Sequence, residues 1–159
     1  YSDAEDLLPE VEVSDAMSGI DERQTEWTLD GQRIQPGTAV PLYSLELGPH
    51  VFTVSARDAA GNAAVTSVEF RTVASLEGLK TLVNRFAGIG WIDNAGIANS
   101  LQAKLEHNHL TAFINEIEAQ TGKHITEQAS SILLRDARAL MDEHNDAHDE
   151  TTGTTMSIE

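Results

Sequence analysis

Apolar and polar residues alternate along the first half of the chain, which is the pattern of strands with one buried face. The clearest run covers residues 50–56, where Phe52 and Val54 share a face. Shorter alternating runs cover residues 11–13, 27–29, 40–47 and 65–70. Asp30 and Gly31 form a pair that favours a two-residue hairpin, because both central positions of a type I′ turn need positive φ. Short strands with turn signals at this spacing predict a small antiparallel sandwich.

From Leu76 onward the apolar residues recur every three or four positions, which is the pattern of amphipathic helices. Ser75 and Asn94 are candidate N-caps of the first two helices. The four predicted stripes comprise Leu76, Leu79, Leu82, Val83, Phe86 and Ile89; Ile97, Leu101 and Leu105; Leu110, Phe113, Ile114 and Ile117; and Ile132, Leu133, Ala137, Leu140 and Met141. We expect these helices to form a compact four-helix bundle.

The change of hydrophobic period near Ala74 predicts two domains and a tail. Residues 1–74 are expected to form the β domain and residues 75–144 the helical bundle. Residues 145–159 are acidic and polar, with too few apolar side chains to pack, and predict a disordered tail. The chain opens at Tyr1 without an initiator Met or a signal peptide, so we expect a processed product or an excised fragment whose first domain can be truncated at its N-terminus.

Charge and composition exclude several classes of partner. The net charge is −16, from 10 Lys and Arg residues against 26 Asp and Glu residues. Nucleic acids and anionic membranes both attract basic surfaces, so neither is expected to bind. The absence of Cys excludes disulfides, thiol catalysis and thiolate metal sites, and leaves the redox compartment open.

An ordered set of motifs in the first half resembles a known module. S-G-I at 18–20, T-L-D-G at 28–31 and L-G-P-H-V-F-T-V-S-A-R-D-A-A-G-N at 47–62 follow one another in this order. The set resembles the bacterial immunoglobulin-like modules that are appended to secreted enzymes and surface proteins. Together with the alternation, this resemblance implies an all-β immunoglobulin-like antiparallel sandwich, followed by the all-α four-helix bundle.

The second half is similar to the FIMAH domain, a small helical module that closes many secreted bacterial hydrolases, lyases and proteases. The matching residues are G-W-I-D-N-A-G-I-A-N-S-L-Q-A-K-L at 90–105 and L-T-A-F-I-N-E-I-E-A-Q-T-G-K-H-I-T at 110–126. The resemblance implies a non-catalytic accessory module. Its partner would be an upstream catalytic domain of the same polypeptide, and its location secreted or cell-surface.

The residues agree that this chain is not itself an enzyme. It has no G-x-S-x-G nucleophile elbow, no H-E-x-x-H zinc motif and no glycine-rich phosphate loop. Acidic residues are abundant, so their spacing alone does not mark a catalytic carboxylate pair. We therefore assign no catalytic residue.

Two pairs of oxygen ligands on predicted loops are candidates for calcium. These pairs are Asp15 with Asp21, and Asp58 with Asn62. The alternative for both pairs is turn capping, because Asp and Asn side chains bond their own backbone two residues further on. Calcium is therefore a possible cofactor, and no other cofactor is expected.

Histidines lie at two further positions. His107 and His109 flank the predicted turn E-H-N-H, where a polar loop is the better explanation. His144 and His148 are four residues apart among acidic residues and can hold a divalent ion if the last helix extends that far. The alternative for this second pair is a solvated acidic tail.

Carbohydrate binding would use exposed aromatic platforms, and the chain has few aromatic residues, with 2 Trp, 2 Tyr and 4 Phe. Trp91 lies in a predicted interhelical loop, where its indole either meets a sugar ring or plugs one end of the bundle. Asn94, Asn99, Asn115 and Gln120 match polar positions of the family, and either cap helices or meet a ligand. Of these residues, Trp91, Asn94 and Asn115 are the predicted ligand-binding set.

The sequence thus predicts a non-catalytic accessory region that combines a spacer with a module for targeting polysaccharide or cell wall, or for stability. The parent protein would be a secreted hydrolase or polysaccharide lyase. The alternative is a structural or adhesive segment of a cell-surface protein that binds no sugar.

Overall fold

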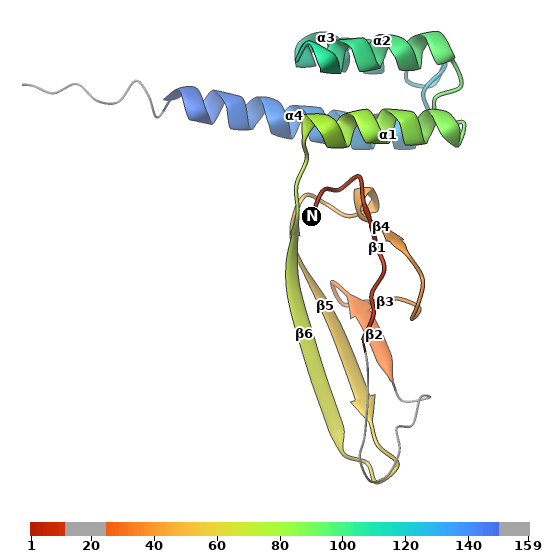
Figure 1. Ribbon diagram of the computed structural model, residues 1–159, viewed down its shortest axis with the longest axis vertical. Coiled ribbons are helices and arrows are strands. Elements are labelled where there is room, and N and C mark those ends of the chain that lie inside the picture. The colour runs from red at the N-terminus through yellow and green to blue at the C-terminus, as the bar shows by residue number, and fades with distance from the viewer. Residues whose placement is uncertain (12–24, 150–159) are drawn as a thin grey trace, which may run out of the picture. The chain divides into compact units, whose positions relative to one another are not determined.

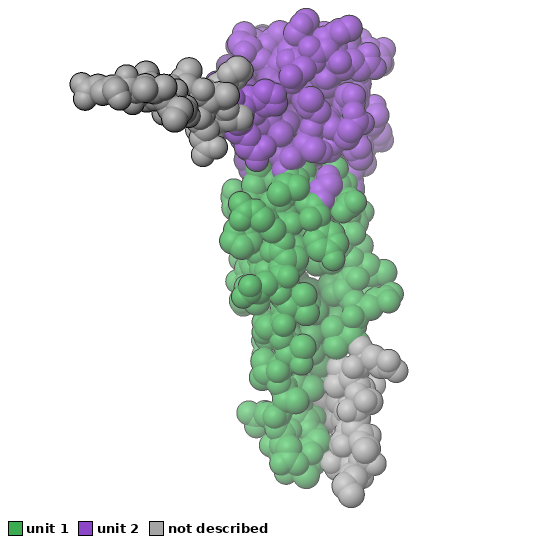
Figure 2. Space-filling view, turned by 60° about the vertical axis from the view of Figure 1, so that its left-hand side comes forward, with its two compact units in different colours: residues 1, 3–73 green, residues 2, 74–159 purple. Residues whose placement is uncertain are grey.

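The computed structural model describes residues 1–11 and 25–149, without the side chains of 146–149. The chain divides into two compact units (Figure 2). The first consists of Tyr1 and Asp3–Val73, and the second consists of Ser2 and the chain from Ala74 onward. Each unit is described by itself.

The described part of the first unit contains two antiparallel sheets (Figure 1). Its strands are β1 (Asp6–Leu7), β2 (Glu26–Leu29), β3 (Gln32–Arg33), β4 (Val40–Pro41), β5 (Gly48–Arg57) and β6 (Ala63–Thr72). Four of them form a sheet in the order β3-β2-β5-β6, and β1 pairs with β4. The β2–β3 connection is the predicted hairpin turn, with φ of 49° at Asp30 and 78° at Gly31.

The core of this unit lies on one face of the four-stranded sheet. Trp27 and Leu29 of β2 lie opposite Val54 and Phe52 of β5, and all four side chains are buried. The Trp27 and Phe52 rings meet edge to face, with centroids 5.6 Å apart. The alternation in the sequence therefore correctly predicts which face of each of the two strands is buried.

The prediction of an all-β immunoglobulin-like sandwich followed by an all-α bundle is wrong. A sandwich needs two facing sheets, but β1 and β4 have only two residues each. Pro41 has no N–H to donate, and the chain after it turns into the 3-10 helix Leu42–Ser44, so the alternation at 40–47 does not produce a long strand. The helical unit also contains bridges from Ile125 to Ile92 and Thr121. The chain is a mixed α and β protein with six strands and four helices in its described ranges.

The helices of the second unit are α1 (Leu76–Gly88), α2 (Ala95–Glu106), α3 (Leu110–Gln120) and α4 (Glu127–Asp149). The Ser75 hydroxyl caps α1 by accepting a hydrogen bond of 2.9 Å from the Gly78 N–H. The largest fully buried side chains of the unit are Phe86, Phe113, Leu79, Leu82, Leu101, Leu105, Ile117, Ile125, Leu133 and Val83. The helix α4 continues to Asp149, past the predicted boundary at residue 144, and residues 150–159 lie outside the described ranges.

A buried imidazole links the β2–β3 turn to the end of β6. The His50 side chain is 5% exposed. Its Nδ1 lies 2.7 Å from the Asp30 carboxylate, and its Nε2 lies 2.8 Å from the Glu46 carbonyl oxygen and 3.0 Å from the Thr72 hydroxyl. Burial raises the pKa of Asp30, but hydrogen bonds from the Val51 N–H and His50, with the charge of His50, outweigh this and hold the pKa below its ordinary value of 3.8.

Replacing Asp30 by Asn is expected to flatten the acid side of the stability profile. Because the folded pKa of Asp30 is lowered, its ionised form stabilises the fold above about pH 3.8, and this contribution is lost as the pH falls through the lowered pKa. Asn tolerates positive φ and keeps an oxygen for the Val51 N–H. Urea unfolding between about pH 2 and pH 6, followed by Trp27 fluorescence in a Trp91→Phe background, measures this. An unchanged acid slope in Asp30→Asn would contradict the assignment.

Candidate functional site

The connection between α2 and α3 is a tight turn that the local sequence builds. His107 caps the C-terminus of α2, and Asn108 follows at φ 55° in the left-handed region that Asn tolerates. The Asn108 N–H donates to the Leu105 carbonyl at 3.1 Å, and the His109 N–H donates to the Lys104 carbonyl at 2.8 Å. This pair of bonds is a Schellman motif, and it places His109 at the start of α3.

A groove lies between this turn, the first residues of α3 and the later part of α4. It is lined by Asn108, His109, Leu110, Thr111, Ala112, Met141, His144 and Asn145. Its volume is about 460 Å³, within the range of roughly 300–1,000 Å³ that is typical of small-molecule sites. Most of the surface area that lines the groove is apolar. The side chains of the two histidines, the two asparagines and Thr111 are exposed. The groove therefore combines an apolar wall with accessible polar groups.

The two groove histidines have different hydrogen-bonding roles. The His144 Nδ1 lies 3.2 Å from the Leu140 carbonyl oxygen and donates a hydrogen bond to it. The Nε2 atom, on the opposite side of the ring, takes no part in that bond. The His109 side chain makes no capping bond to α3. Its ring lies beside that of His107, with centroids 5.8 Å apart. Both groove imidazoles can thus exchange hydrogen bonds with a bound hydroxyl group.

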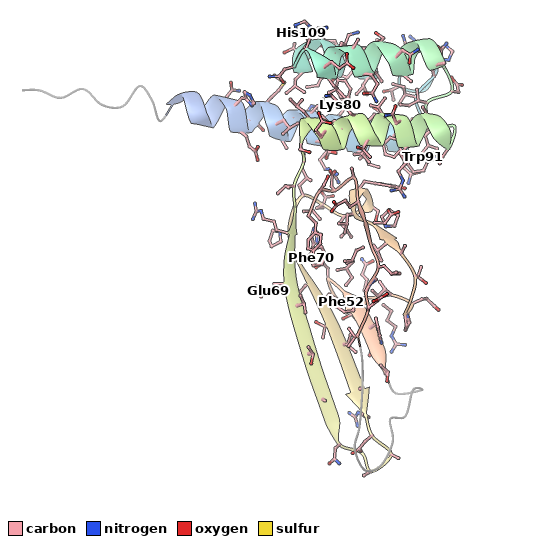
Figure 3. All side chains as sticks on the ribbon, viewed as in Figure 1. Phe52, Glu69, Phe70, Lys80, Trp91 and His109 are labelled. Atoms are coloured by element: carbon pink, nitrogen blue, oxygen red, sulfur yellow. The ribbon has the colours of Figure 1, made fainter. Side chains whose placement is uncertain are left out.

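The structure does not bring the predicted ligand residues together with the groove. Trp91 and His109 lie at opposite ends of the helical unit (Figure 3). Trp91 is half-buried, and its ring lies 5.1 Å from that of Phe86, which has no exposed surface. Its carbonyl accepts a hydrogen bond of 2.9 Å from the Thr126 N–H. These contacts fix Trp91 against the end of the helical unit.

The two predicted asparagines have different environments. The Asn94 side-chain oxygen accepts hydrogen bonds from the Gly96 and Ile97 N–H groups, at 2.9 and 3.2 Å. This amide is therefore an N-cap of α2. Asn115 is exposed on α3.

Substituting Asn94 by Ala is expected to destabilise the helical unit by about 1 kcal/mol, because both first-turn donors lose their acceptor. Chemical unfolding followed by circular dichroism at the helix band measures the change. Asn115→Ala is the matched control and is expected to change stability by less than about 0.5 kcal/mol. Equal effects of the two substitutions would contradict the capping role.

Of the two predicted calcium pairs, the described one forms turn hydrogen bonds. The Asp58 carboxylate accepts hydrogen bonds from the backbone N–H and the side-chain amide of Asn62, each at 2.7 Å. Asp15 and Asp21 lie outside the described residues. Within the described ranges no three His, Asp or Glu side chains converge as a metal ligand set.

Sequence reasoning missed the groove as a site. It interpreted His107 and His109 as parts of a polar loop and placed His144 in a metal-binding or solvated tail. The E-H-N-H turn was the available signal, but nothing in the sequence placed α4 beside it. The missed residues are those of the turn and of the start of α3 (Asn108, His109, Leu110, Thr111 and Ala112), together with Met141, His144 and Asn145 of α4.

Neither the helices nor the comparisons with known proteins give a further assignment. None of the described helices has the length and apolar content needed to cross a bilayer. Comparison with models of known protein families, with curated proteins and with solved structures finds no match. The fold and the site thus define a chain with one antiparallel β unit and one helical unit that carries an open groove. The immunoglobulin-like and FIMAH resemblances remain predictions.

Proposed function

We propose that the chain is a non-catalytic accessory region of a secreted bacterial enzyme, and that its helical unit contacts polysaccharide through the groove between α3 and α4. The groove is the observation that carries this proposal. The sequence resemblance to FIMAH modules supports the same class of function.

The chemistry of the groove suits a sugar. A pyranose ring offers an apolar C–H face and a rim of hydroxyl groups. Leu110 and Met141 supply an apolar wall, while His109, His144 and Asn145 supply donors and acceptors. A neutral polysaccharide also avoids the repulsion that a chain of net charge −16 would exert on an anionic polymer.

Weak binding is sufficient for such a role. A module that holds a catalytic domain on an insoluble polymer raises the local concentration of substrate, without new contacts in the active site. The β unit would then act as a spacer, and the upstream catalytic domain would be the partner within the same polypeptide.

Retention on insoluble polysaccharides tests the proposal. The full chain would be incubated with cellulose, chitin, xylan and mannan, and the unbound fraction measured. We expect at least one polymer to retain it, and the double variant His109→Ala/His144→Ala to bind about tenfold more weakly. His107→Ala is the matched control, because it removes an imidazole from the same turn without removing a residue that lines the groove.

Two outcomes would redirect the proposal. Loss of retention in Trp91→Ala with an unchanged double-histidine variant would place the site at the other end of the helical unit. Retention on no polymer would refute sugar binding and favour the alternative, a structural or adhesive segment of a cell-surface protein.

A further inference from the structure

The strand β6 is a long edge strand whose two faces are both exposed from Ala63 to Glu69. It covers ten residues and follows β5 at the margin of the four-stranded sheet (Figure 1). Every side chain from Ala63 to Glu69 is exposed, including Val65 at 67% and Val68 at 56%. Exposed apolar side chains on a long edge are unusual, because such an edge readily pairs with another strand.

The outer backbone groups of β6 are used at only one end in the described ranges. The Tyr1 amino group donates to the Arg71 carbonyl, the Val73 N–H donates to the Tyr1 carbonyl, and the Asp3 N–H donates to the Val73 carbonyl. Because backbone groups alternate in direction along a strand, those of residues 63, 65, 67 and 69 face the same edge. No described residue bonds them.

The open part of this edge also lacks protecting charges. The residues from Ala63 to Val68 read A-A-V-T-S-V, in a chain of net charge −16. Edge strands usually avoid association through charged residues, proline, bulges or a covering element. Glu69 is the first charged side chain on this strand, and it is exposed (Figure 3).

We propose that β6 is a dimerisation surface, on which a second copy of this chain adds its own β6 in antiparallel orientation, with Thr66 opposite Thr66. In this register Ala63 lies opposite Glu69 of the second copy, and Val65 lies opposite Ser67. All the outer backbone groups of 63, 65, 67 and 69 are then paired. Registers shifted toward Arg71 meet the positions that Tyr1 and Asp3 already occupy.

Charge complementarity also favours a second copy of this chain in this register. Arg57 of β5 lies opposite Ala63 of β6, so the two side chains share a face of the sheet. Glu69 of one copy therefore faces Arg57 of the other across the small side chain of Ala63, and the twofold symmetry repeats this ion pair. Both side chains are exposed, and neither has an ion-pair partner within residues 1–11 and 25–149. The proposed register thus places opposite charges together and keeps like charges apart.

Sedimentation equilibrium of the full chain over a range of concentrations tests the proposal. We expect a monomer–dimer equilibrium in the wild type. Arg57→Glu and Glu69→Arg are each expected to weaken the dimer about tenfold, and the double variant Arg57→Glu/Glu69→Arg to restore it. Lys123→Glu is the control, since it makes the same change of charge as Arg57→Glu at an exposed position of the helical unit.

A backbone variant tests the edge separately. Val65→Pro removes one outer N–H but no bond to β5, and is expected to abolish the dimer, whereas Val65→Ala keeps it. Circular dichroism establishes that each variant is folded, and the charge variants decide the matter if Val65→Pro is not. A wild type that stays monomeric at all concentrations would overturn the proposal. If the Arg57 and Glu69 variants left the strength of the dimer unchanged, both the proposed register and the assignment of β6 as the dimer surface would be overturned.

Discussion

Replacing Phe86 by alanine is expected to destabilise the helical unit by about 3–5 kcal/mol. Phe86 has no exposed surface, and its ring contacts that of Trp91. Its backbone carbonyl accepts hydrogen bonds from the Trp91 and Ile92 N–H groups, at 2.8 and 3.1 Å, and these bonds survive the substitution. The cost therefore arises from lost apolar burial and from the cavity that remains.

Urea unfolding followed by circular dichroism at the helix band measures the loss. Ile89→Ala is the control, because Ile89 closes the same helix but is 53% exposed. It is expected to change the free energy of unfolding by less than about 0.5 kcal/mol. A cost below about 1 kcal/mol for Phe86→Ala would mean that this end of the helical unit is loosely packed.

Replacing His50 by leucine is expected to destabilise the β unit by about 2–4 kcal/mol. Leucine fills much of the space but donates nothing, so the Glu46 carbonyl and the Asp30 carboxylate lose their imidazole partner. Asp30 is partly solvated, with its side chain 43% exposed, so water replaces part of its lost hydrogen bond. Most of the destabilisation therefore comes from the hydrogen bond between the imidazole and the Glu46 carbonyl.

Trp27 fluorescence in the Trp91→Phe background follows unfolding of this unit. His107→Leu, at an exposed turn of the helical unit, makes the same chemical change and should leave the transition of Trp27 unchanged. A variant of His50 that unfolds at the wild-type urea concentration would show that the hydrogen bonds of the imidazole contribute nothing net.

Local features were predictable from the sequence because their causes are local. The Ser75 and Asn94 caps act on N–H groups two or three residues away, and the turn at Asp30 and Gly31 needs only residues that tolerate positive φ. The helical stripes need only a period of three or four residues.

The sandwich was mispredicted because a second sheet depends on pairing between distant strands. Alternating side chains at 40–47 are compatible with a strand, but Pro41 removes a donor and the following residues close a 3-10 turn. Alternation reports one apolar face and carries no information about which strand pairs with which.

The groove was missed for a related reason. His109 and His144 lie on different helices, and their proximity depends on how α3 packs against α4. Trp91 was predicted as a ligand residue because it is a large aromatic residue in a loop. Such a loop can instead hold its ring against a helix, as the contact with Phe86 shows.

The most direct test of the account is to observe where a sugar contacts the chain. Amide and histidine resonances of the full chain would be followed by NMR, during titration with a soluble oligosaccharide of the polymer that retains it. We predict shifts confined to residues 108–112 and 141–145, with the Trp91 indole resonance unchanged. Shifts centred on Trp91, or no shifts at the highest oligosaccharide concentration, would contradict the assignment of the groove as the polysaccharide site.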